Sequence, residues 1–380
     1  MARYDAIRTP AFVLEEDRLR ANLELIRSVQ EAADVQIILA LKAFAMWRVF
    51  PLVGEYLSSA TASSLHEARL IAEEMGKRAH TYCVAYNPDD FAAILSYSSH
   101  LTFNSIQQYH HYQSTIDSHT APISCGIRVN PEYSAVDTDL YNPAARGSRL
   151  GVTETAFDDG LPEGIEGLHF HTLCESSSYE LEQTLIAFEA KFGKWLPHLK
   201  WVNMGGGHLM TREGYDVPHL IQLLKNFKAR YPNLSIILEP GSAIAWQTGP
   251  LVTTVLDIVE NREVRTVIID ASFTAHMPDT LEMPYRPVIR GAASEVQTGQ
   301  PTYRIGGVSC LAGDYLAEYS FEWALQIGDR LIFEDMMHYT TVKTTFFNGV
   351  QHPDLCLLRS SGELEVVRRF GYADFKGKLG

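Results

Sequence analysis

Lys42 stands directly after an apolar run, in the stretch LALKAFAMW (residues 39–47), and apolar residues resume at once beyond it. A strongly hydrated ammonium group is costly to bury unless it is paired with an anion or its pKa is lowered. The position therefore indicates one of two roles. Lys42 is either a salt-bridge partner at the end of a buried strand, or an amine that takes part in chemistry.

Three further stretches place unusual residues after apolar runs. The stretch HFHTLCE contains His169 and His171, NMGGGH contains three consecutive glycines at 205–207, and LEPGS contains Glu239. Each has a purely structural interpretation: a core histidine with satisfied hydrogen bonds, a flexible turn, and a strand-end carboxylate that pairs with Lys42. Glycines between a strand and a helix can also bind phosphate through their backbone N–H groups.

Together these four features are the parts needed to hold pyridoxal phosphate. A lysine amine can attach covalently to the aldehyde of this cofactor. A carboxylate that faces the pyridine nitrogen keeps it protonated, so that the ring accepts electrons. A flat imidazole can stack on the ring, and glycine amides can hold the phosphate. We therefore interpret Lys42, His171, the glycines at 205–207 and Glu239 as one cofactor site.

The elements that would bring these residues together alternate along the first two thirds of the chain. Short apolar runs are followed by segments with helical spacing, such as SSLHEARLIAEEMG, which Ser63 or Ser64 can cap with Glu67 at capping-box distance. Eight strand–helix units in about 230 residues fit a (β/α)8 barrel, in which chemistry sits at the carboxyl ends of the strands. The runs are Val35–Leu41, Ser58–Thr61, Ala79–Val84, Leu101–Phe103, Ile123–Val129, Ile165–Phe170, Trp201–Met204 and Ser235–Leu238.

After about residue 245 the pattern changes to strands separated by turns, as in PLVTTVLDIVENREVRTVIIDAS, PTYRIGGVSC and GDRLIFEDM. No long segment with helical spacing interrupts them. The sequence therefore predicts an α/β protein with a TIM-type barrel at residues 15–248 and a mostly β domain at 249–380. The first residues, 1–14, are expected to pair with the β domain.

Composition narrows the classes of function. The chain of 380 residues is 46% hydrophobic, which is enough for a large core and two domains. Its formal net charge of −14, with no basic run, argues against nucleic acid as a partner and suits a cationic substrate. No apolar run reaches the length of about 18 residues that a membrane span needs, and the first residues lack the apolar core of a signal peptide. Five scattered cysteines without a CxxC pair predict a reducing, cytoplasmic location with neither disulfides nor a metal site.

The motifs LALKAF, ATASSLHEA, IRVNP, GSRLGV, GLHFHTLCE, NMGGGH, LEPGSAI, CLAGDYL and HYTTVKTTFFNG occur in this order along the chain. Together they resemble the fold-type III pyridoxal-phosphate decarboxylases, the group that includes diaminopimelate, ornithine and arginine decarboxylases. The resemblance runs from about residue 9 to residue 370, and members of this group have a barrel plus a β domain. The forms HFHTLCE and EPGS are most similar to the carboxynorspermidine (carboxyspermidine) decarboxylase branch of polyamine biosynthesis.

The resemblance implies a role for each residue of the cofactor site. Lys42 holds pyridoxal 5'-phosphate covalently and returns at the end of the cycle to release the product, so it is also catalytic. His171 stacks on the cofactor ring, Gly206 and Gly207 bind the phosphate, and Glu239 faces the pyridine nitrogen.

The resemblance also assigns three residues of the β domain. Tyr339, in HYTT, reaches the phosphate; Cys310, in SCLAGD, is the proton donor of the reaction; and Asp314 lies near the substrate. In this family the donor cysteine comes from the other subunit of a two-fold dimer. The resemblance therefore implies a homodimer with two shared active sites.

Two departures from related sequences bear on the substrate. Relatives that act on diaminopimelate or ornithine usually carry H-x-G-S where this chain has HTLC at 171–174, and E-P-G-R where it has Ser242 in place of the arginine. A serine cannot reproduce the bidentate phosphate contact of a guanidinium, and in diaminopimelate decarboxylases that arginine also helps to read a distal carboxylate. We therefore expect a small amino acid with a cationic, polyamine-type tail: carboxynorspermidine or carboxyspermidine, decarboxylated to norspermidine or spermidine. The residues expected to bind it, each of which could instead be a solvated loop group, are Glu239, His276, Asp279 and Asp314, with Asp270 a weaker candidate.

Other functions stay open at this point. Within the same fold, the substrate could be ornithine or diaminopimelate. The chain could also bind pyridoxal phosphate without catalysis, as a carrier or a regulator of a related enzyme, although such a protein would need neither Cys310 nor an aspartate four residues beyond it. An amino-acid racemase on the same barrel usually needs a tyrosine base in the second domain, whereas Cys310 fits decarboxylation better.

Overall fold

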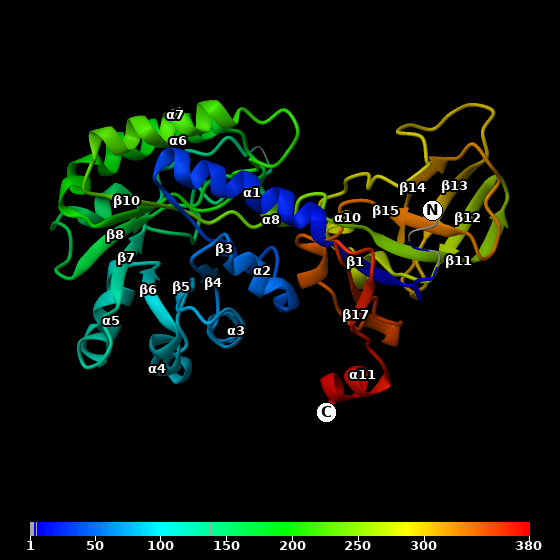
Figure 1. Cartoon of the computed structure of the whole chain (residues 1–380), viewed down its shortest axis with the longest axis horizontal. Coiled ribbons are helices and arrows are strands. Elements are labelled where there is room, and N and C mark those ends of the chain that lie inside the picture. The colour runs from blue at the N-terminus through cyan, green and yellow to red at the C-terminus, as the bar shows by residue number, and fades with distance from the viewer. Residues whose placement is uncertain (1–3, 5, 137) are drawn as a thin grey trace. The chain divides into compact units, whose positions relative to one another are not determined.

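The chain forms two compact units, one of residues 21–244 and one of residues 1–20 together with 245–380. The corresponding division from the sequence is 15–248 and 249–380 with 1–14. The computed structural model describes residues 4, 6–136 and 138–380 (Figure 1). Within those residues, no helix has both the length and the apolar character that a membrane span requires.

The first unit is built on a parallel sheet that closes on itself. Its strand order is β2-β10-β9-β8-β7-β6-β5-β4-β3, and all neighbours are parallel. The sheet closes because β2 and β3 are two parts of one strand, interrupted at Ile38, and pair with opposite neighbours. The bounds are β2 Gln36–Ile37, β3 Leu39–Ala40, β4 Ala60–Ala62, β5 Ala79–Tyr82, β6 Ser98–Phe103, β7 Ser124–Arg128, β8 Ile165–His169, β9 Trp201–Asn203 and β10 Ser235–Leu238. The predicted (β/α)8 barrel is confirmed: the first predicted run contains both β2 and β3, and each of the other seven overlaps one strand.

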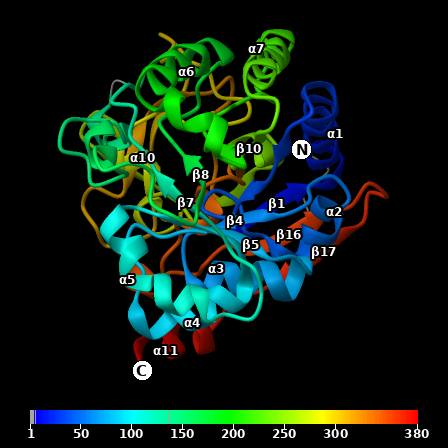
Figure 2. The ribbon, with the colours of Figure 1, turned by 90° about the vertical axis from the view of Figure 1, so that its left-hand side faces the viewer.

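Helices surround these strands, as Figure 2 shows. Ser64 caps α3, because its hydroxyl accepts a hydrogen bond from the backbone N–H of Glu67 at 3.2 Å; this confirms one of the two predicted caps. Ser177 caps α6 in a reciprocal capping box with Glu180. The helix bounds are α1 Glu16–Ala33, α2 Phe50–Gly54, α3 Leu65–Leu70, α4 Pro88–Tyr97, α5 Ile106–Asp117, α6 Ser178–Phe192, α7 Val217–Arg230 and α8 Ser242–Ala245.

Trp201 fills the interior of the barrel at one level. A Cβ atom on Gly126 would lie 2.3 Å from the indole ring, and one on Gly167 would lie 2.0 Å from it. Both positions must therefore lack a side chain for the ring to fit. The indole N–H donates to Ser124 Oγ at 2.8 Å, so its polar atom is satisfied.

The second unit is a mixed β domain. Its strands follow the order β14-β13-β12-β11-β1-β16-β17, and β15 pairs with β11. The N-terminal strand β1 lies between β11 and β16, antiparallel to the first and parallel to the second. The bounds are β1 Ala11–Glu15, β11 Leu251–Asn261, β12 Val264–Ile269, β13 Thr302–Gly306, β14 Tyr315–Ser320, β15 Arg330–Phe333, β16 Asp354–Leu358 and β17 Leu364–Arg368, with short helices α9 Phe273–His276, α10 Asp279–Glu282 and α11 Tyr372–Leu379.

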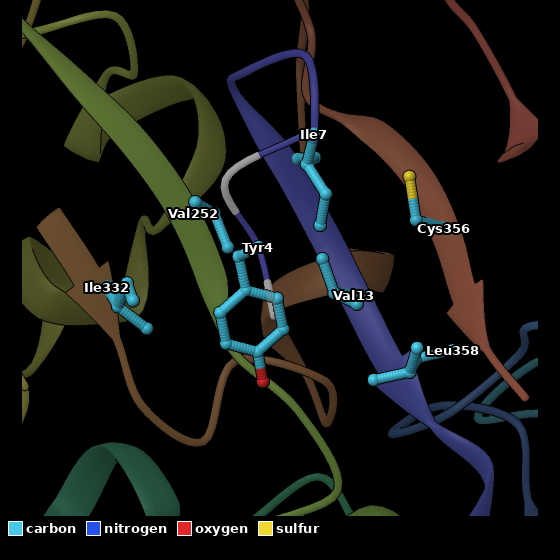
Figure 3. Close-up of a cluster of buried hydrophobic side chains, with 8 residues drawn as sticks. Tyr4, Ile7, Val13, Val252, Ile332, Cys356 and Leu358 are labelled. Carbon is cyan, nitrogen blue, oxygen red and sulfur yellow. The ribbon is translucent and has the colours of Figure 1, made fainter. Parts of the chain in front are cut away.

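A buried cluster ties β1 into this sheet (Figure 3). Val13 of β1 packs in this cluster with Val252 of β11 and Leu358 of β16. Tyr4 closes the cluster, and its hydroxyl donates to the carboxylate of Glu15. The N-terminal strand is therefore part of the core of the β domain.

Candidate active site

The four features that the sequence singled out lie together at the carboxyl ends of the barrel strands. Lys42 lies in the turn after β3, and its Nζ is 3.4 Å from Nε2 of His171, which follows β8. Gly206 follows β9, and its backbone N–H donates to Nδ1 of the same imidazole at 2.8 Å. Glu239 follows β10 directly. Parallel strands bring these ends to one face, which is why residues far apart in the sequence meet here.

The side chain of Lys42 is exposed, but many protein atoms lie around its amine. These atoms displace part of the water that would hydrate the ammonium, and this partial desolvation is the largest influence on the pKa of Lys42 and lowers it. The carboxylate of Glu239 opposes the effect, whereas the guanidinium of Arg128 adds to it. A lowered pKa increases the fraction of neutral amine, which is the form that attacks a carbonyl carbon.

His171 is held as a neutral ring. Burial, together with the nearby charges of Lys42 and Arg128, lowers the pKa of its imidazole well below the ordinary value. Arg128 Nη2 also donates to the carbonyl oxygen of His171 at 3.1 Å, which fixes the backbone at this point. A neutral imidazole offers a flat face on which an aromatic ring can stack.

Glu239 is held as an anion by two donors. His169 Nε2 lies 2.9 Å from Oε1, and the side-chain amide of Asn203 donates to Oε2 at 3.0 Å. Burial alone would raise the pKa of this carboxyl group, but His169, Asn203 and the charge of Lys42 together lower it. The pKa of His169 is itself lowered by burial, so we assign it as a neutral imidazole that donates its Nε2–H to the carboxylate.

The glycines after β9 are required by the close approach of other backbone segments. A Cβ atom on Gly205 would lie 2.5 Å from the carbonyl oxygen of Phe170, and one on Gly207 would lie 2.3 Å from that of Leu173. Both glycines also have positive φ angles, +72° and +87°. This turn therefore brings the segments after β8 and β9 together with no side chain between them.

Three residues of this site were not assigned a role from the sequence. His169, at the end of β8, and Asn203, at the end of β9, hold Glu239, and Arg128, at the end of β7, holds the backbone of His171. Each is a buried polar residue at the carboxyl end of a barrel strand. That position was the available signal, because polar residues are otherwise uncommon in such strands.

In the β domain, Cys310 and Asp314 belong to one loop between β13 and β14. The thiol of Cys310 is exposed. The carboxylate of Asp314 is buried and accepts hydrogen bonds from its own chain: Oδ1 from the backbone N–H groups of Phe273 and Thr274, at 2.7 and 3.0 Å, and Oδ2 from the hydroxyl of Ser309 at 2.6 Å. In this arrangement Asp314 shapes the loop that carries Cys310.

The other residues expected to bind a cationic tail are engaged within the same domain. Lys343 pairs with the carboxylates of both Asp279 and Glu282. His276 is fully buried, and its Nδ1 accepts the backbone N–H of Ser272 at 3.1 Å. Asp270 Oδ1 accepts the backbone N–H of residue 254 at 2.8 Å. Each of these three side chains therefore has at least one structural partner in the described chain.

Tyr339 has an unusual backbone conformation, with φ +53° and ψ −51°. Its carbonyl oxygen accepts hydrogen bonds from the backbone N–H groups of Val342 and Lys343, at 3.0 and 3.1 Å, which maintain that conformation. Such a conformation in a non-glycine residue costs free energy of order 1–3 kcal/mol, and residues that adopt one occur most often at functional sites. Tyr339 is one of eight described non-glycine residues with a positive φ, so this angle alone does not assign it a role.

Comparison with known proteins places this geometry in a family. The family described as "Pyridoxal-dependent decarboxylase, C-terminal sheet domain" matches residues 56–337. The chain is 53% identical to the carboxyaminopropylagmatine decarboxylase of Synechocystis sp., over all of this chain and 97% of that protein. It is 46% identical to the carboxynorspermidine/carboxyspermidine decarboxylase of Campylobacter jejuni, over 98% of both chains.

Solved structures of related decarboxylases have the same fold as this chain. The crystal structure of carboxynorspermidine decarboxylase from Campylobacter jejuni, complexed with norspermidine, superposes with a TM-score of 0.91 at 44% identity and covers 98% of this chain and 100% of that one. Diaminopimelate decarboxylase from Helicobacter pylori has the same fold, with a TM-score of 0.86 at 18% identity over 99% of this chain and 98% of that one. The chain belongs to the fold-type III pyridoxal-dependent decarboxylases, in the carboxynorspermidine decarboxylase family.

Proposed function

We propose that this decarboxylase of polyamine biosynthesis uses pyridoxal 5'-phosphate to remove the α-carboxylate from an amino acid whose side chain is a cationic polyamine. Membership of a pyridoxal-dependent family supports the cofactor. The relatives that match the whole length of the chain support the substrate class, since each is named for a carboxylated polyamine precursor.

The residues at the barrel face fit this cofactor. The amine of Lys42, with its lowered pKa, suits covalent attachment to the aldehyde. The glycines 205–207, where a Cβ atom would meet neighbouring backbone, form the close turn after β9 at which we propose that the phosphate binds. Glu239 supplies the negative charge for a protonated pyridine nitrogen, and His171 supplies the flat neutral face. Tyr339 is proposed as a further phosphate contact.

The single observation that carries the proposal is the double support of Glu239. Two donors hold this carboxylate anionic beside an amine whose pKa is lowered. When bound, pyridoxal phosphate supplies an electron-accepting ring. With the cofactor in place, the substrate would lose its α-carboxylate as carbon dioxide, and the thiol of Cys310 would transfer its proton to the α-carbon, leaving a thiolate that would regain a proton from water. Glu239 makes this step faster because its charge keeps the ring nitrogen protonated.

Two tails are proposed for the substrate. The sequence favours carboxynorspermidine or carboxyspermidine, which end in a primary ammonium, and the Campylobacter jejuni relative is named for both. The 53% identical relative is named for carboxyaminopropylagmatine, whose agmatine part ends in a guanidinium group. All three share the same reacting amino-acid end. They differ in the length of the tail and in the cation at its far end. The choice therefore depends on the side chains there, for which the sequence suggests Glu239, His276, Asp279 and Asp314.

The test is product formation by the purified enzyme, loaded with cofactor. We expect carbon dioxide release from carboxyaminopropylagmatine, carboxynorspermidine or carboxyspermidine, with kcat/KM for the preferred one at least about 100-fold above that for ornithine and diaminopimelate. That ratio corresponds to about 3 kcal/mol of transition-state discrimination. Equal turnover of ornithine or diaminopimelate would refute the substrate class. Cofactor binding without decarboxylation of any of the five would instead favour a carrier or regulator.

We further propose that the active sites are shared in a homodimer. Cys310 lies in the β domain, and by its resemblance to the family we propose that its thiol acts at the barrel face of the other subunit. Exposed apolar side chains next to it support an interface, because Leu311 is 45% exposed and Phe347 is also 45% exposed. A two-fold axis would complete both sites at once.

A further inference from the structure

We infer that Asn348 is the positioning residue for Cys310: its side chain holds the backbone of the cysteine and so sets where the thiol can deliver a proton. The inference rests on the proposed role of Cys310 as the proton donor. It concerns residues of the β domain alone.

The contact is a direct hydrogen bond across a long stretch of sequence. The backbone N–H of Cys310 donates to Oδ1 of Asn348 at 2.7 Å, between residues 38 positions apart. From within the loop, the hydroxyl of Ser309 accepts from the backbone N–H of Leu311 at 3.3 Å and donates to Asp314 at 2.6 Å. Asp314 therefore holds one side of the cysteine, and Asn348 holds its backbone from outside the loop.

The backbone of Asn348 is committed to this orientation. Its φ and ψ angles are +59° and +6°, in the left-handed region, which asparagine tolerates better than most residues. This conformation costs free energy that a residue with a negative φ would not incur. An unusual backbone angle at a residue whose side chain holds a proposed catalytic loop fits a device for preorganisation.

The segment that carries Asn348 is itself anchored. Gly349 also has a positive φ, +65°, and a Cβ atom there would lie 3.2 Å from Cζ of Phe375 in α11. The phenyl ring thus packs directly on the backbone next to Asn348. Thr345 Oγ1 accepts the backbone N–H of Phe347 at 3.3 Å on the other side. The asparagine therefore sits on a supported segment.

Placement of the sulfur matters because proton transfer requires the donor to be within hydrogen-bond reach of the carbon that it protonates. A displacement of about 1 Å at such a group can cost about 100-fold in rate. Asp314 and Ala271 also tie this loop to the domain, but through residues 314 and 308, whereas the hydrogen bond from Asn348 acts on the backbone of the cysteine itself. Loss of the Asn348 acceptor should therefore lower kcat without a comparable change in KM.

Two variants separate the hydrogen bond from the backbone angle. Asn348→Gly removes the acceptor but accepts the left-handed conformation without strain. Asn348→Asp keeps an acceptor oxygen and also tolerates that conformation. We expect the glycine variant to lose about tenfold in kcat, as loss of one hydrogen bond suggests, and the aspartate variant to stay within about threefold of wild type. Cys310→Ala, measured in parallel, tests the proposed donor role separately.

Readouts other than activity decide the matter. In the holoenzyme, two rates should increase by about tenfold in Asn348→Gly: amide hydrogen exchange of residues 307–314 and alkylation of Cys310 by iodoacetamide. Neither rate should change in Asn348→Asp. Alkylation of Cys174, the other exposed thiol, should be equal in all three proteins and is the internal control.

The inference is overturned if kcat, exchange and alkylation are all normal in Asn348→Gly while Cys310→Ala is inactive. It is also overturned if kcat falls but the loop is unaffected, because Asn348 would then act in some other way. Should the glycine variant fail to fold, the wild-type protein still decides, since a Cys310 amide that exchanges as fast as in a free peptide would contradict the hydrogen bond. An active Cys310→Ala protein would refute the proposed donor instead.

Discussion

His169 and Glu239 form a buried hydrogen bond, with 2.9 Å between Nε2 and Oε1, at the barrel face that also holds Lys42. The carboxylate is satisfied on its other oxygen by Asn203 at 3.0 Å. A buried carboxylate without such donors would become protonated, because burial disfavours charge. The pair therefore preserves the anion that the proposed chemistry needs, and the first prediction follows from it.

Replacement of Glu239 by glutamine should slow decarboxylation by roughly 10²–10³-fold, the size expected for one preorganised electrostatic group. The amide keeps the shape and can still accept a hydrogen bond, but it has no charge. Cofactor content, measured by absorbance after purification, should fall much less than the rate. Near-normal turnover would show that Glu239 is only structural.

Asn203→Ala is the matched variant for that experiment. It keeps the carboxylate of Glu239 and removes one of its two donors. We expect a loss of about tenfold in kcat, which corresponds to one hydrogen bond to a charged group. A loss as large as that of Glu239→Gln would mean that Asn203 does more than hold the carboxylate.

Lys42→Ala should abolish the visible absorption of covalently bound cofactor. The change removes the amine, while His171 and the glycine turn remain to bind the cofactor without a covalent bond. The absorption spectrum of the purified variant, with and without added pyridoxal phosphate, is the measurement. A spectrum that matches the wild-type protein would place the attachment on another residue.

The barrel also contains a pair of histidines that makes the fold sensitive to acid. His80 of β5 and His100 of β6 stack with ring centroids 3.9 Å apart. Burial lowers the pKa of His80 to about 3 and that of His100 to about 4, and the neighbouring His100 ring contributes to the lowered pKa of His80. In the unfolded chain both would titrate near 6.5.

The sign of the effect follows from proton uptake. Below pH 6.5 these two histidines bind protons in the unfolded state but not in the folded state. The free energy of unfolding therefore decreases as the pH falls from 6.5 toward the pKa values of the folded state. Each of the two histidines should lower the free energy of unfolding by up to about 2 kcal/mol at pH 5 relative to pH 7. Urea unfolding of wild type and His80→Gln at both pH values tests this. The variant should lose less stability on acidification, and an equal loss in both proteins would contradict the assignment.

Mixed dimers test the shared site. Lys42→Ala and Cys310→Ala chains should each be nearly inactive alone. After subunit exchange, half of the dimers would be hybrids with one intact site of two, so activity should recover to about a quarter of wild type. Exchange is confirmed independently with differently tagged chains. No recovery after confirmed exchange would place Cys310 and Lys42 of one site in the same chain.

The sequence by itself determined the barrel and the face on which its chemistry lies. Eight apolar runs at strand length, with helical segments between them, allow few other folds. Lys42, His171, Gly206 and Glu239 could be placed together because each follows such a run, and parallel strands present their carboxyl ends on one side. One run, 35–41, was predicted as a single strand, and the structure divides it at Ile38 because its two parts pair with different neighbours.

Only the tertiary structure decided which groups hold the reactive ones. His169 is 70 positions from the carboxylate that it supports, and Asn348 is 38 positions from the cysteine amide that it binds. No periodicity in the sequence encodes such pairs, because a hydrogen bond of about 3 Å depends on strand register, side-chain rotamer and loop path together. The same reason explains why the structure gives Asp279 a lysine partner that its loop position did not predict.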